Sequence, residues 1–341
     1  MVTLKRLAQE LGLSVATVSR ALNGYPEVSE ATRQRVAELA LSLKYTPNQS
    51  AQRLVTGRSR TVVLVMHTRQ QMAYYDHHFE LIEHLTAAFQ NRNLDLFVSL
   101  STATDFLAQY SRLARGGTVD GFVILGPEVD DARIRLLRSL NVPFVVHGRS
   151  DAAATYPFYD IDNFGVGYQS TRMLLDLGHH RIALLNFPPR LHFAYERRRG
   201  YAQALAEAGI AVDPTLVCDI GFNAGGLDAS LGLLLRDAVT RPTAVICGST
   251  LLAHELYARL NEHGLRVPDD VSVIAHDDGL PQCRASDFLP ELTVTQAPLH
   301  EASAPLADFF CRYAAGEAAE GLHLVREVSI VYRKSVGARR S

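Results

Sequence analysis

The chain has 341 residues, of which 47% are hydrophobic and 21% charged, so it can form two or three folded domains and is not compositionally disordered. It contains no run of about 18 uncharged apolar residues, which excludes an ordinary transmembrane helix. The N-terminal residues carry charges and lack the apolar segment of a secretory signal, so we expect a cytoplasmic protein. The four cysteines are too widely spaced for a zinc motif or a dense disulfide framework, and reduced thiols are expected.

The net charge of −2 is unevenly distributed along the chain. The first 60 residues hold nine lysines and arginines against four acidic residues, a net charge of +5, and the remainder carries −7. A small basic segment on a larger acidic body favours binding of that segment to a polyanion such as nucleic acid. On charge alone, an exposed helical surface with several arginines is an equally good explanation.

Three helices are predicted in residues 1–46. Apolar residues recur at helical spacing over residues 3–11, and Gly12 is expected to end that helix. Ser14 suits the N-cap of a second helix over residues 15–22, and a third helix begins after Ser29. The short connection between the first two helices is typical of a helix-turn-helix, although any small three-helix domain could show this pattern.

The polar face of the second predicted helix favours DNA binding over a generic helical domain. Thr17, Ser19 and Arg20 lie opposite the apolar Val18 and Leu22. Short hydroxyl side chains and a guanidinium group bind phosphates and base edges.

Residues 48–54 can form a short helix but contain few core residues, and residues 56–60 form a polar, basic linker. Such a segment cannot bury enough apolar area to fold alone, so we expect it to order on binding. A plain interdomain tether is the alternative.

The segments TLKRLAQELGLSVATVSRALNG, PEVSEATRQRV and LKYTPNQSAQRL resemble the headpiece of the lactose/galactose repressor family of bacterial transcription regulators. The resemblance implies that the second helix lies in the major groove, where the small side chains of Val15 and Ala16 suit thymine methyl groups. It also implies a hinge helix that pairs with its dimer mate in the minor groove, with Leu54 as an intercalating wedge and Ala51 at the helix contact. A buried structural role is the alternative for Leu54. The DNA-binding residues implied are Thr3, Ser14, Val15, Ala16, Thr17, Ser19, Arg20, Asn23, Asn48, Ala51, Arg53 and Leu54.

From residue 61 onward, short apolar runs alternate with amphipathic helical patterns. This alternation predicts parallel α/β sheets, and the number of strands favours two lobes that face each other across a ligand-binding cleft. The predicted strands are residues 62–66, 94–100, 121–125, 144–146, 182–187, 244–247, 271–275, 292–295 and 328–332.

The pieces TVDGFVILG, FYDIDNFGVGYQSTRMLLDLGHHRIALL and GLRVPDDVSVIAHDD resemble the ligand-binding core of the same family, which is similar to periplasmic sugar-binding proteins. The resemblance implies an all-α helix-turn-helix headpiece plus a two-lobed α/β core with parallel sheets, whose chain crosses between lobes three times. The expected boundaries are 1–46 for the headpiece, 47–60 for the hinge and linker, 61–160 and 293–323 for lobe one, and 161–292 and 324–341 for lobe two.

Arg197 is a candidate effector ligand. It precedes Gly200 and Tyr201 by the spacing of the family arginine that binds effector hydroxyls or a carboxylate. A guanidinium suits this role because its rigid fork donates two parallel hydrogen bonds. The alternative is an exposed arginine in a basic run with Arg198 and Arg199.

Asp277, which follows a predicted strand, is a second candidate, because open-sheet ligands bind at the carboxyl ends of strands and a carboxylate accepts hydrogen bonds from sugar hydroxyls. The neighbouring Asp278 has an obvious alternative role as a helix cap. Ser249 and Thr250 stand where the family usually carries Asn-Asp, so the effector contacts are expected to differ there.

The paired His77 and His78 replace a pair of aromatic residues common in the family. Because no third ligand shows recognisable spacing, we expect hydrogen bonding or stacking on an effector rather than a metal site, and no cofactor is expected. Phe222 matches a position that packs on the sugar ring, although such aromatic residues are more often core. The candidate effector-binding residues are His77, His78, His147, Phe193, Arg197, Phe222, Ser249 and Asp277.

Two other classes of protein are disfavoured. Gly165-Val166-Gly167 resembles half a dinucleotide fingerprint but lacks the third glycine, and the chain has no GxSxG, HExxH or phosphate-loop motif, which argues against an enzyme. A periplasmic binding protein would need a signal peptide and no DNA-binding segment.

We therefore expect a homodimeric repressor that binds a palindromic operator and releases it when a small sugar, with glucosides among the candidates, closes the cleft. Corepression by a purine is the alternative. No leucine-heptad tail follows Tyr332, which favours a dimer over a tetramer.

Overall fold

A computed structural model describes residues 2–22, 25–45, 59–67, 75–101, 105–220 and 224–339, with the backbone alone described for residues 67, 75–78 and 224–229. It divides into two compact units, Met1–Ser59 and Arg60–Ser341. In the part of the chain that is described, no helix is long and apolar enough to cross a membrane.

The first unit contains the three predicted helices, α1 (Leu4–Leu11), α2 (Val15–Leu22) and α3 (Glu30–Ser42). Gly12 ends α1 as predicted, with a φ of +65° that a residue with a side chain rarely adopts. Ser14 caps α2 by accepting a hydrogen bond from the Thr17 amide at 3.0 Å. The buried residues that join the three helices are Leu7, Ala8, Val18, Ala21, Val28, Val36 and Ala40.

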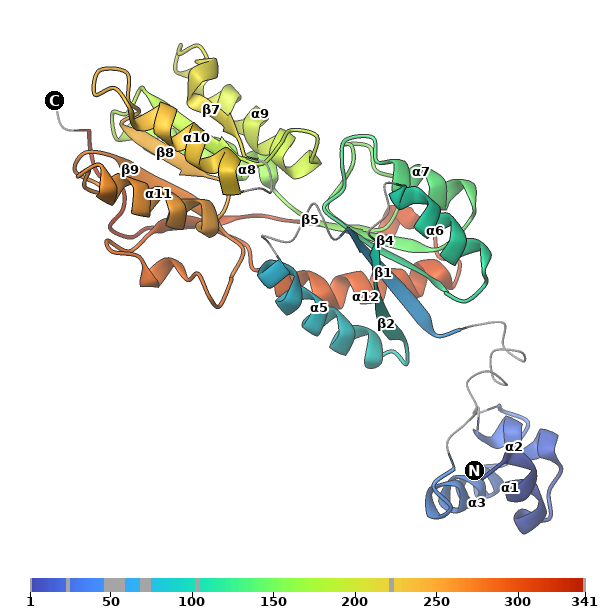
Figure 1. The fold of residues 1–341 in the computed structure, drawn as a ribbon. Coiled ribbons are helices and arrows are strands. Elements are labelled where there is room, and N and C mark those ends of the chain that lie inside the picture. Colours follow the sequence, from blue (N-terminus) through green and yellow to red (C-terminus); the bar gives the residue numbers. More distant parts are fainter. Residues whose placement is uncertain are drawn as a thin grey trace. The chain divides into compact units, whose positions relative to one another are not determined.

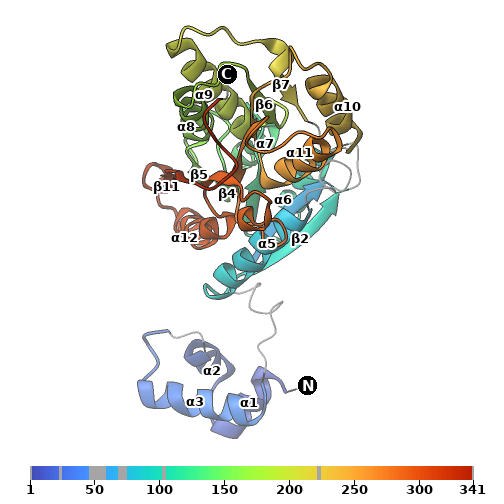
Figure 2. The same ribbon diagram turned by 90° about the vertical axis from the view of Figure 1, so that its left-hand side faces the viewer.

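The second unit has two lobes, each with a six-stranded sheet between layers of helices (Figure 1). In lobe one the strand order is β11-β5-β4-β3-β1-β2. Helices α5 and α12 lie side by side on one face of this sheet (Figures 1 and 2), and α6 and α7 cover the other. The elements are β1 (Thr61–His67), α5 (Tyr75–Gln90), β2 (Asp95–Ser101), α6 (Phe106–Arg115), β3 (Gly121–Leu125), α7 (Ala132–Ser139), β4 (Phe144–His147), β5 (Phe158–Ile161), α12 (Ser303–Ala314) and β11 (His323–Arg326).

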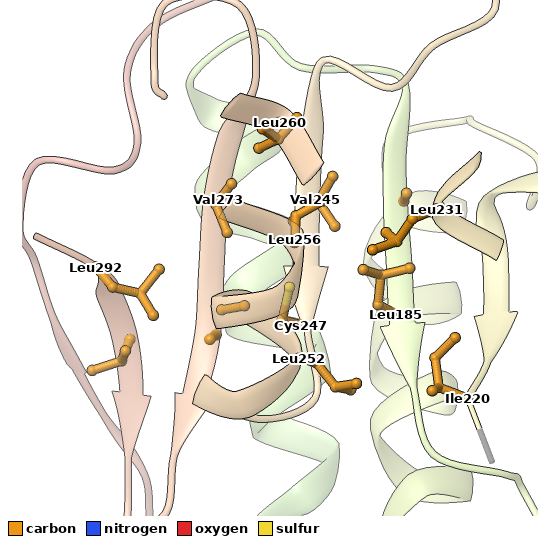
Figure 3. Close-up of a cluster of buried hydrophobic side chains, with 14 of the residues drawn as sticks. Leu185, Ile220, Leu231, Val245, Cys247, Leu252, Leu256, Leu260, Val273 and Leu292 are labelled. Carbon is orange, nitrogen blue, oxygen red and sulfur yellow. The ribbon is translucent and has the colours of Figure 1, made fainter. Parts of the chain in front are cut away.

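In lobe two the strand order is β12-β10-β9-β8-β6-β7. Helices α10 and α11 cover one face, where leucines of α11 pack on the strands (Figure 3), and α8 and α9 cover the other. The elements are α8 (Asn163–Asp176), β6 (Ile182–Asn186), α9 (His192–Glu207), β7 (Val217–Asp219), α10 (Ala224–Leu235), β8 (Ala244–Cys247), α11 (Thr250–Glu262), β9 (Ser272–Asp277), β10 (Thr293–Gln296) and β12 (Ser329–Val331), with short 3-10 helices η2 (Pro214–Leu216), η3 (Ala285–Asp287), η4 (Leu299–Ala302) and η5 (Ala319–Gly321) along the second unit.

Among the strands in the described residues, all pairs are parallel except β10 with β12, and the nine predicted strands are present. The apolar pattern does not predict β5, β7 or β11, which have three or four residues each. β11 is an edge strand whose four residues are all exposed, and only two of them, Leu324 and Val325, are apolar.

The chain crosses between the lobes three times, after β5, β10 and β11, and the last strand lies in lobe two. The expected lobe boundaries need two corrections. β10 belongs to the second sheet, because it continues the ladder of β9 with Thr293 beside Ile274. β11 belongs to the first sheet, where Leu324 lies beside Tyr159. The second crossover therefore follows Gln296, and the third follows Arg326.

Candidate DNA-binding and effector sites

Helix α2 presents a polar and small-residue face to solvent. Val15 is 43% exposed and Ala16 and Arg20 are also exposed, whereas Val18 and Ala21 are buried in the three-helix core. Within the described residues, the Arg20 guanidinium makes no hydrogen bond or ion pair. The arrangement leaves the basic and small side chains available to a duplex.

The other predicted DNA-binding residues fall into two groups. Thr3 is an exposed N-cap that accepts a hydrogen bond from the Arg6 amide, and Thr17 shares a 2.8 Å hydroxyl contact with Ser14. Ser19 is half-buried on α2. Asn23, Asn48, Ala51, Arg53 and Leu54 lie outside the described residues.

A cavity of about 340 Å³ lies between the two lobes, at the carboxyl ends of their strands. This volume falls within the range of small-molecule sites, about 300–1,000 Å³. Lobe one contributes the segments after β3, β4 and β5, and lobe two contributes the start of α9 and the residue after β9. The position agrees with the rule that open α/β sheets bind ligands at this edge.

Arg197 lies in the wall of the cavity on α9 and is 5% exposed. Its Nε donates to Asn163 Oδ1 at 2.9 Å and its Nη1 to the Gly248 carbonyl at 2.6 Å, while its guanidinium carbon lies 5.1 Å from the centre of the Phe193 ring. Burial lowers the pKa of Arg197 to about 10, so the side chain remains charged at neutral pH. Its Nη2 makes no hydrogen bond to any described residue and can donate to a ligand.

Asn163 continues this network across the first crossover. Its Nδ2 donates to Asp160 Oδ1 at 3.1 Å, and Arg149 Nε donates to Asp160 Oδ2 at 2.7 Å. Burial raises the pKa of Asp160, although the hydrogen bond and charge of Arg149 oppose the shift. The chain Arg197–Asn163–Asp160–Arg149 lines the cavity and joins the polar groups of the two lobes.

Asp131 and Arg133 form a second polar element in the wall of lobe one. Arg133 donates from Nε to Asp131 Oδ1 at 3.0 Å and from Nη2 to Oδ2 at 2.6 Å. Burial opposes ionisation of Asp131, but the hydrogen bonds and charge of Arg133 outweigh it and lower the pKa of this carboxyl. The opposite charges of Asp131 and Arg133 compensate each other, so we interpret this ion pair as a structural part of the cavity wall.

The two aspartates after β9 point to different places. Asp278 lines the cavity, with Oδ1 3.2 Å from His276 Nε2. Asp277 instead accepts a hydrogen bond from the Gly279 amide at 2.8 Å and lines a separate hollow with Arg284. The sequence expectation that Asp277 faces the cleft therefore differs from the structure, because Asp277 lies on the α10/α11 side of the sheet.

Of the remaining candidate effector-binding residues, some line the cavity and others do not. His147, stacked at 6.0 Å on Tyr159, lines the cavity together with Phe193. Ser249 is fully buried away from the lining and caps α11 through the Leu252 amide. His77 and His78 lie in α5, but their side chains are outside the part of the structure that is described. Phe222 lies outside it entirely.

The lobes touch at the edge of the cavity. The backbone of Glu128 in lobe one forms an antiparallel bridge with Leu191 in lobe two, and the Val129 amide donates to the Arg190 carbonyl at 2.8 Å. The side chains of Arg190 and Glu128 form an ion pair across the same gap. These contacts join the two lobes at this edge of the cavity.

Gly165-Val166-Gly167 has a structural role in helix packing. A Cβ at Gly167 would overlap the Arg197 carbonyl oxygen, and one at Gly200 would overlap the Phe164 carbonyl. Helices α8 and α9 therefore approach so closely that only glycine fits at their crossing. This packing sets the position of Arg197 on the cavity wall.

Two family models match the chain, "Bacterial regulatory proteins, lacI family" over residues 3–48 and "Periplasmic binding protein-like domain" over residues 171–336. The chain is 42% identical over 308 residues to the HTH-type transcriptional regulator AglR of Rhizobium meliloti (strain 1021), with 90% of this chain and 86% of that protein covered. It is 31% identical over 336 residues to the HTH-type transcriptional regulator CelR of Thermobifida fusca, with 98% of each covered.

Two solved structures have the same architecture. A complex of the transcriptional regulator CelR with cellobiose superposes with a TM-score of 0.72 at 29% identity, covering 98% of this chain and 100% of that one. The Lac repressor dimer bound to operator and the anti-inducer ONPF gives a TM-score of 0.81 at 24% identity over 99% of each chain, a similarity of fold.

A helix-turn-helix unit with an exposed α2 face, joined to a two-lobed core with a polar cavity, defines a ligand-responsive DNA-binding regulator. The chain belongs to the lacI family of bacterial regulatory proteins. It is a transcriptional regulator rather than an enzyme, as the sequence predicts.

Proposed function

We propose that this regulator is a cytoplasmic homodimeric repressor that binds a palindromic operator and releases it when a small sugar occupies the cavity. The observation that carries the proposal is the polar network of Arg197, Asn163, Asp160 and Arg149, which spans both lobes at one ligand-sized cavity. A ligand that binds this network shifts the two lobes relative to each other. Such a two-state change couples ligand binding to operator binding with a free energy of about 1–3 kcal/mol. When bound to its operator, the repressor is associated with the nucleoid.

A sugar fits the chemistry of the cavity. Arg197 and Asp278 offer a donor and an acceptor for hydroxyl groups, and the rings of Phe193 and His147 offer flat surfaces. The complex of CelR with cellobiose supports a glucoside, because cellobiose is itself a glucoside. The sugar proposal also assigns the acceptor role to Asp278 in place of Asp277.

A homodimer agrees with the surface of lobe one. Phe97 and Leu100 on the edge strand β2 are 57% and 58% exposed, and Phe79 on α5 is 65% exposed. β2 pairs with β1 on one side only, and an edge strand with large exposed apolar side chains is suited to burial against a second copy. The similarity to the Lac repressor dimer supports the same arrangement.

The proposal is tested by fluorescence anisotropy of the full chain on palindromic DNA from its own upstream region, with and without glucosides, other sugars and purines. We expect salt-sensitive binding that one sugar reverses. Tightening by a purine would establish corepression instead. Absence of salt-sensitive binding to any palindrome would contradict operator recognition.

Replacing Arg20 with alanine should weaken operator binding across sequences, because a phosphate-binding cation is lost, and should reduce the slope of log K against log salt by about one. The measurement is the operator affinity at several salt concentrations. Arg6→Ala is the matched control, because Arg6 already pairs with Glu10 on α1 at 3.1 Å. Equal effects of the two substitutions would contradict the proposal that Arg20 contacts the operator.

Replacing Leu54 with alanine should lower operator affinity with little change in the stability of the core, because a wedge between base pairs acts only in the complex. Operator affinity and thermal unfolding are measured on the same preparation. If the variant destabilises the core, the wedge assignment is wrong.

Replacing Asp278 with asparagine should weaken binding of the sugar that releases the operator by roughly tenfold or more, because a charged acceptor in the cavity is lost. Asp277→Asn is the control and should change the affinity little, since Asp277 faces the other hollow. Calorimetric titration of both variants checks the assignment, and a larger effect of Asp277→Asn would reverse it.

A further inference from the structure

Three side chains with metal-ligating atoms meet where α5 packs against η4, outside the effector network. Glu80 and His84 come from successive turns of α5, and His300 comes from η4. One ligand atom from each of the three lies within 4.8 Å of the others. The i, i+4 spacing places Glu80 and His84 on one face of their helix.

The geometry within this cluster is close. Glu80 Oε1 lies 3.4 Å from His300 Nδ1, and the rings of His84 and His300 have centroids 5.1 Å apart at an interplanar angle of 34°. The Glu80 side chain is 20% exposed and that of His300 is 41% exposed, while His84 is open to solvent. The cluster is therefore accessible from one side and enclosed on the other.

His300 Nδ1 lies within ion-pair distance of the Glu80 carboxylate but makes no hydrogen bond to it. It is buried from solvent, and among the described residues it accepts or donates no hydrogen bond. A buried polar atom that makes no hydrogen bond is costly, and a cation held between His300 Nδ1 and the Glu80 carboxylate would satisfy both.

We propose that Glu80, His84 and His300 bind a divalent transition-metal ion of the zinc type. Two imidazoles and one carboxylate suit Zn²⁺ and its first-row neighbours, whereas Mg²⁺ and Ca²⁺ prefer oxygen ligands alone. Because His84 is exposed, the remaining coordination position is open to water. Zn²⁺ requires ligand distances of about 2.0–2.2 Å, which small rotations of these side chains provide.

The scaffold around the cluster is fixed. Leu81 and Leu85 anchor α5 in the core of lobe one, and Ala302 at the end of η4 is fully buried. Glu301, next to His300, forms an ion pair with Arg326 at 2.7 Å. Ligands on two rigid elements can therefore converge on one ion with little loss of conformational entropy.

A bound ion would tie the second crossover to lobe one. η4 follows β10 and precedes α12, so His300 lies on a segment that connects the lobes. Leu81 and Leu299, the neighbours of Glu80 and His300 in sequence, line the effector cavity. Binding to the folded chain alone should raise the midpoint of thermal unfolding as the metal concentration increases.

The test is calorimetric titration of the untagged full chain with ZnCl₂, together with the variants Glu80→Gln, His84→Gln and His300→Gln. We expect one Zn²⁺ per chain, with at least roughly tenfold weaker binding in each variant. His254→Gln is the matched control, because His254 is a 70% exposed histidine 3.8 Å from a glutamate on α11. This control should bind Zn²⁺ as the unmodified chain does.

The visible absorption of bound Co²⁺ is a second measurement, and it distinguishes loss of a metal ligand from loss of folding. Co²⁺ should give visible absorption bands that Zn²⁺ abolishes, and His84→Gln should change these bands while its far-ultraviolet circular dichroism and metal-free unfolding midpoint stay unchanged. Failure to observe saturable Zn²⁺ binding would overturn the proposal, as would binding unaffected by His84→Gln and His300→Gln. The measurement requires neither operator nor sugar, so it is independent of the proposed repressor function.

Discussion

Replacing Arg197 with alanine should abolish release of the operator by the effector while operator binding itself persists. Arg197 is 5% exposed, and its guanidinium donates to the Asn163 side chain and to the Gly248 carbonyl. Its removal leaves these acceptors unpaired and deprives the ligand of a charged donor, a combined loss of about 2–5 kcal/mol of binding free energy. The effector affinity should fall at least roughly thirtyfold, since 1.4 kcal/mol corresponds to a factor of ten.

Effector affinity by calorimetry and operator affinity by anisotropy are measured on the same variant. Arg198→Ala is the control, because the neighbouring Arg198 is only half-buried and pairs with Asp219 at 3.4 Å outside the cavity lining. Arg197→Lys should recover only part of the affinity, because lysine retains the charge but not the planar fork. An unchanged effector affinity in Arg197→Ala would exclude this cavity as the effector site.

Replacing Gly167 with alanine should destabilise the core by about 1–3 kcal/mol, because forced overpacking displaces backbone and side chains. The new methyl group would overlap the Arg197 carbonyl oxygen, which belongs to a helix backbone and cannot rotate away. Helices α8 and α9 would have to separate, and Arg197 would move with α9. We therefore expect lower effector affinity in addition to lower stability.

The measurement is denaturant unfolding of the full chain, with effector titration on the folded protein. Gly232→Ala is the matched control, because Gly232 lies in α10 and a Cβ there would have open space. Alanine should stabilise this helix by about 0.5–1 kcal/mol. If Gly167→Ala is as stable as Gly232→Ala, the close approach of α8 and α9 does not limit side-chain size.

Much of the local structure follows from the sequence because its causes are local. Gly12 ends α1 through its positive φ, and Ser14 and Ser29 cap α2 and α3 with hydroxyl groups three residues from their targets. Most of the nine apolar runs form buried strands, such as β3 and β9, whereas the edge strands β2 and β12 are largely exposed or half-buried. Of the strands that the pattern does not predict, β7 and β11 are edge strands, whereas the short β5 is buried between β4 and β11.

The candidate site depends on contacts that no local pattern encodes. Arg197 is identifiable by family resemblance, but its partners Asn163 and Gly248 are 34 and 51 residues away and meet it only through the sheet order. Adjacent residues of β9 and the loop after it point to opposite sides of the sheet, so the choice of Asp278 over Asp277 requires the strand register.

By itself, the sequence determined the helix-turn-helix unit and the parallel two-lobed core, because caps, periodicity and spacing are properties of neighbouring residues. The class of regulator followed from the resemblance of its segments to the lactose/galactose repressor family. The tertiary structure alone decided which lobe receives β10, why Gly167 must be glycine, and that His300 meets Glu80 and His84, which precede it by 220 and 216 residues. Those outcomes depend on which strands pair and which helices cross. Long-range packing fixes both, and the spacing of residues along the chain does not.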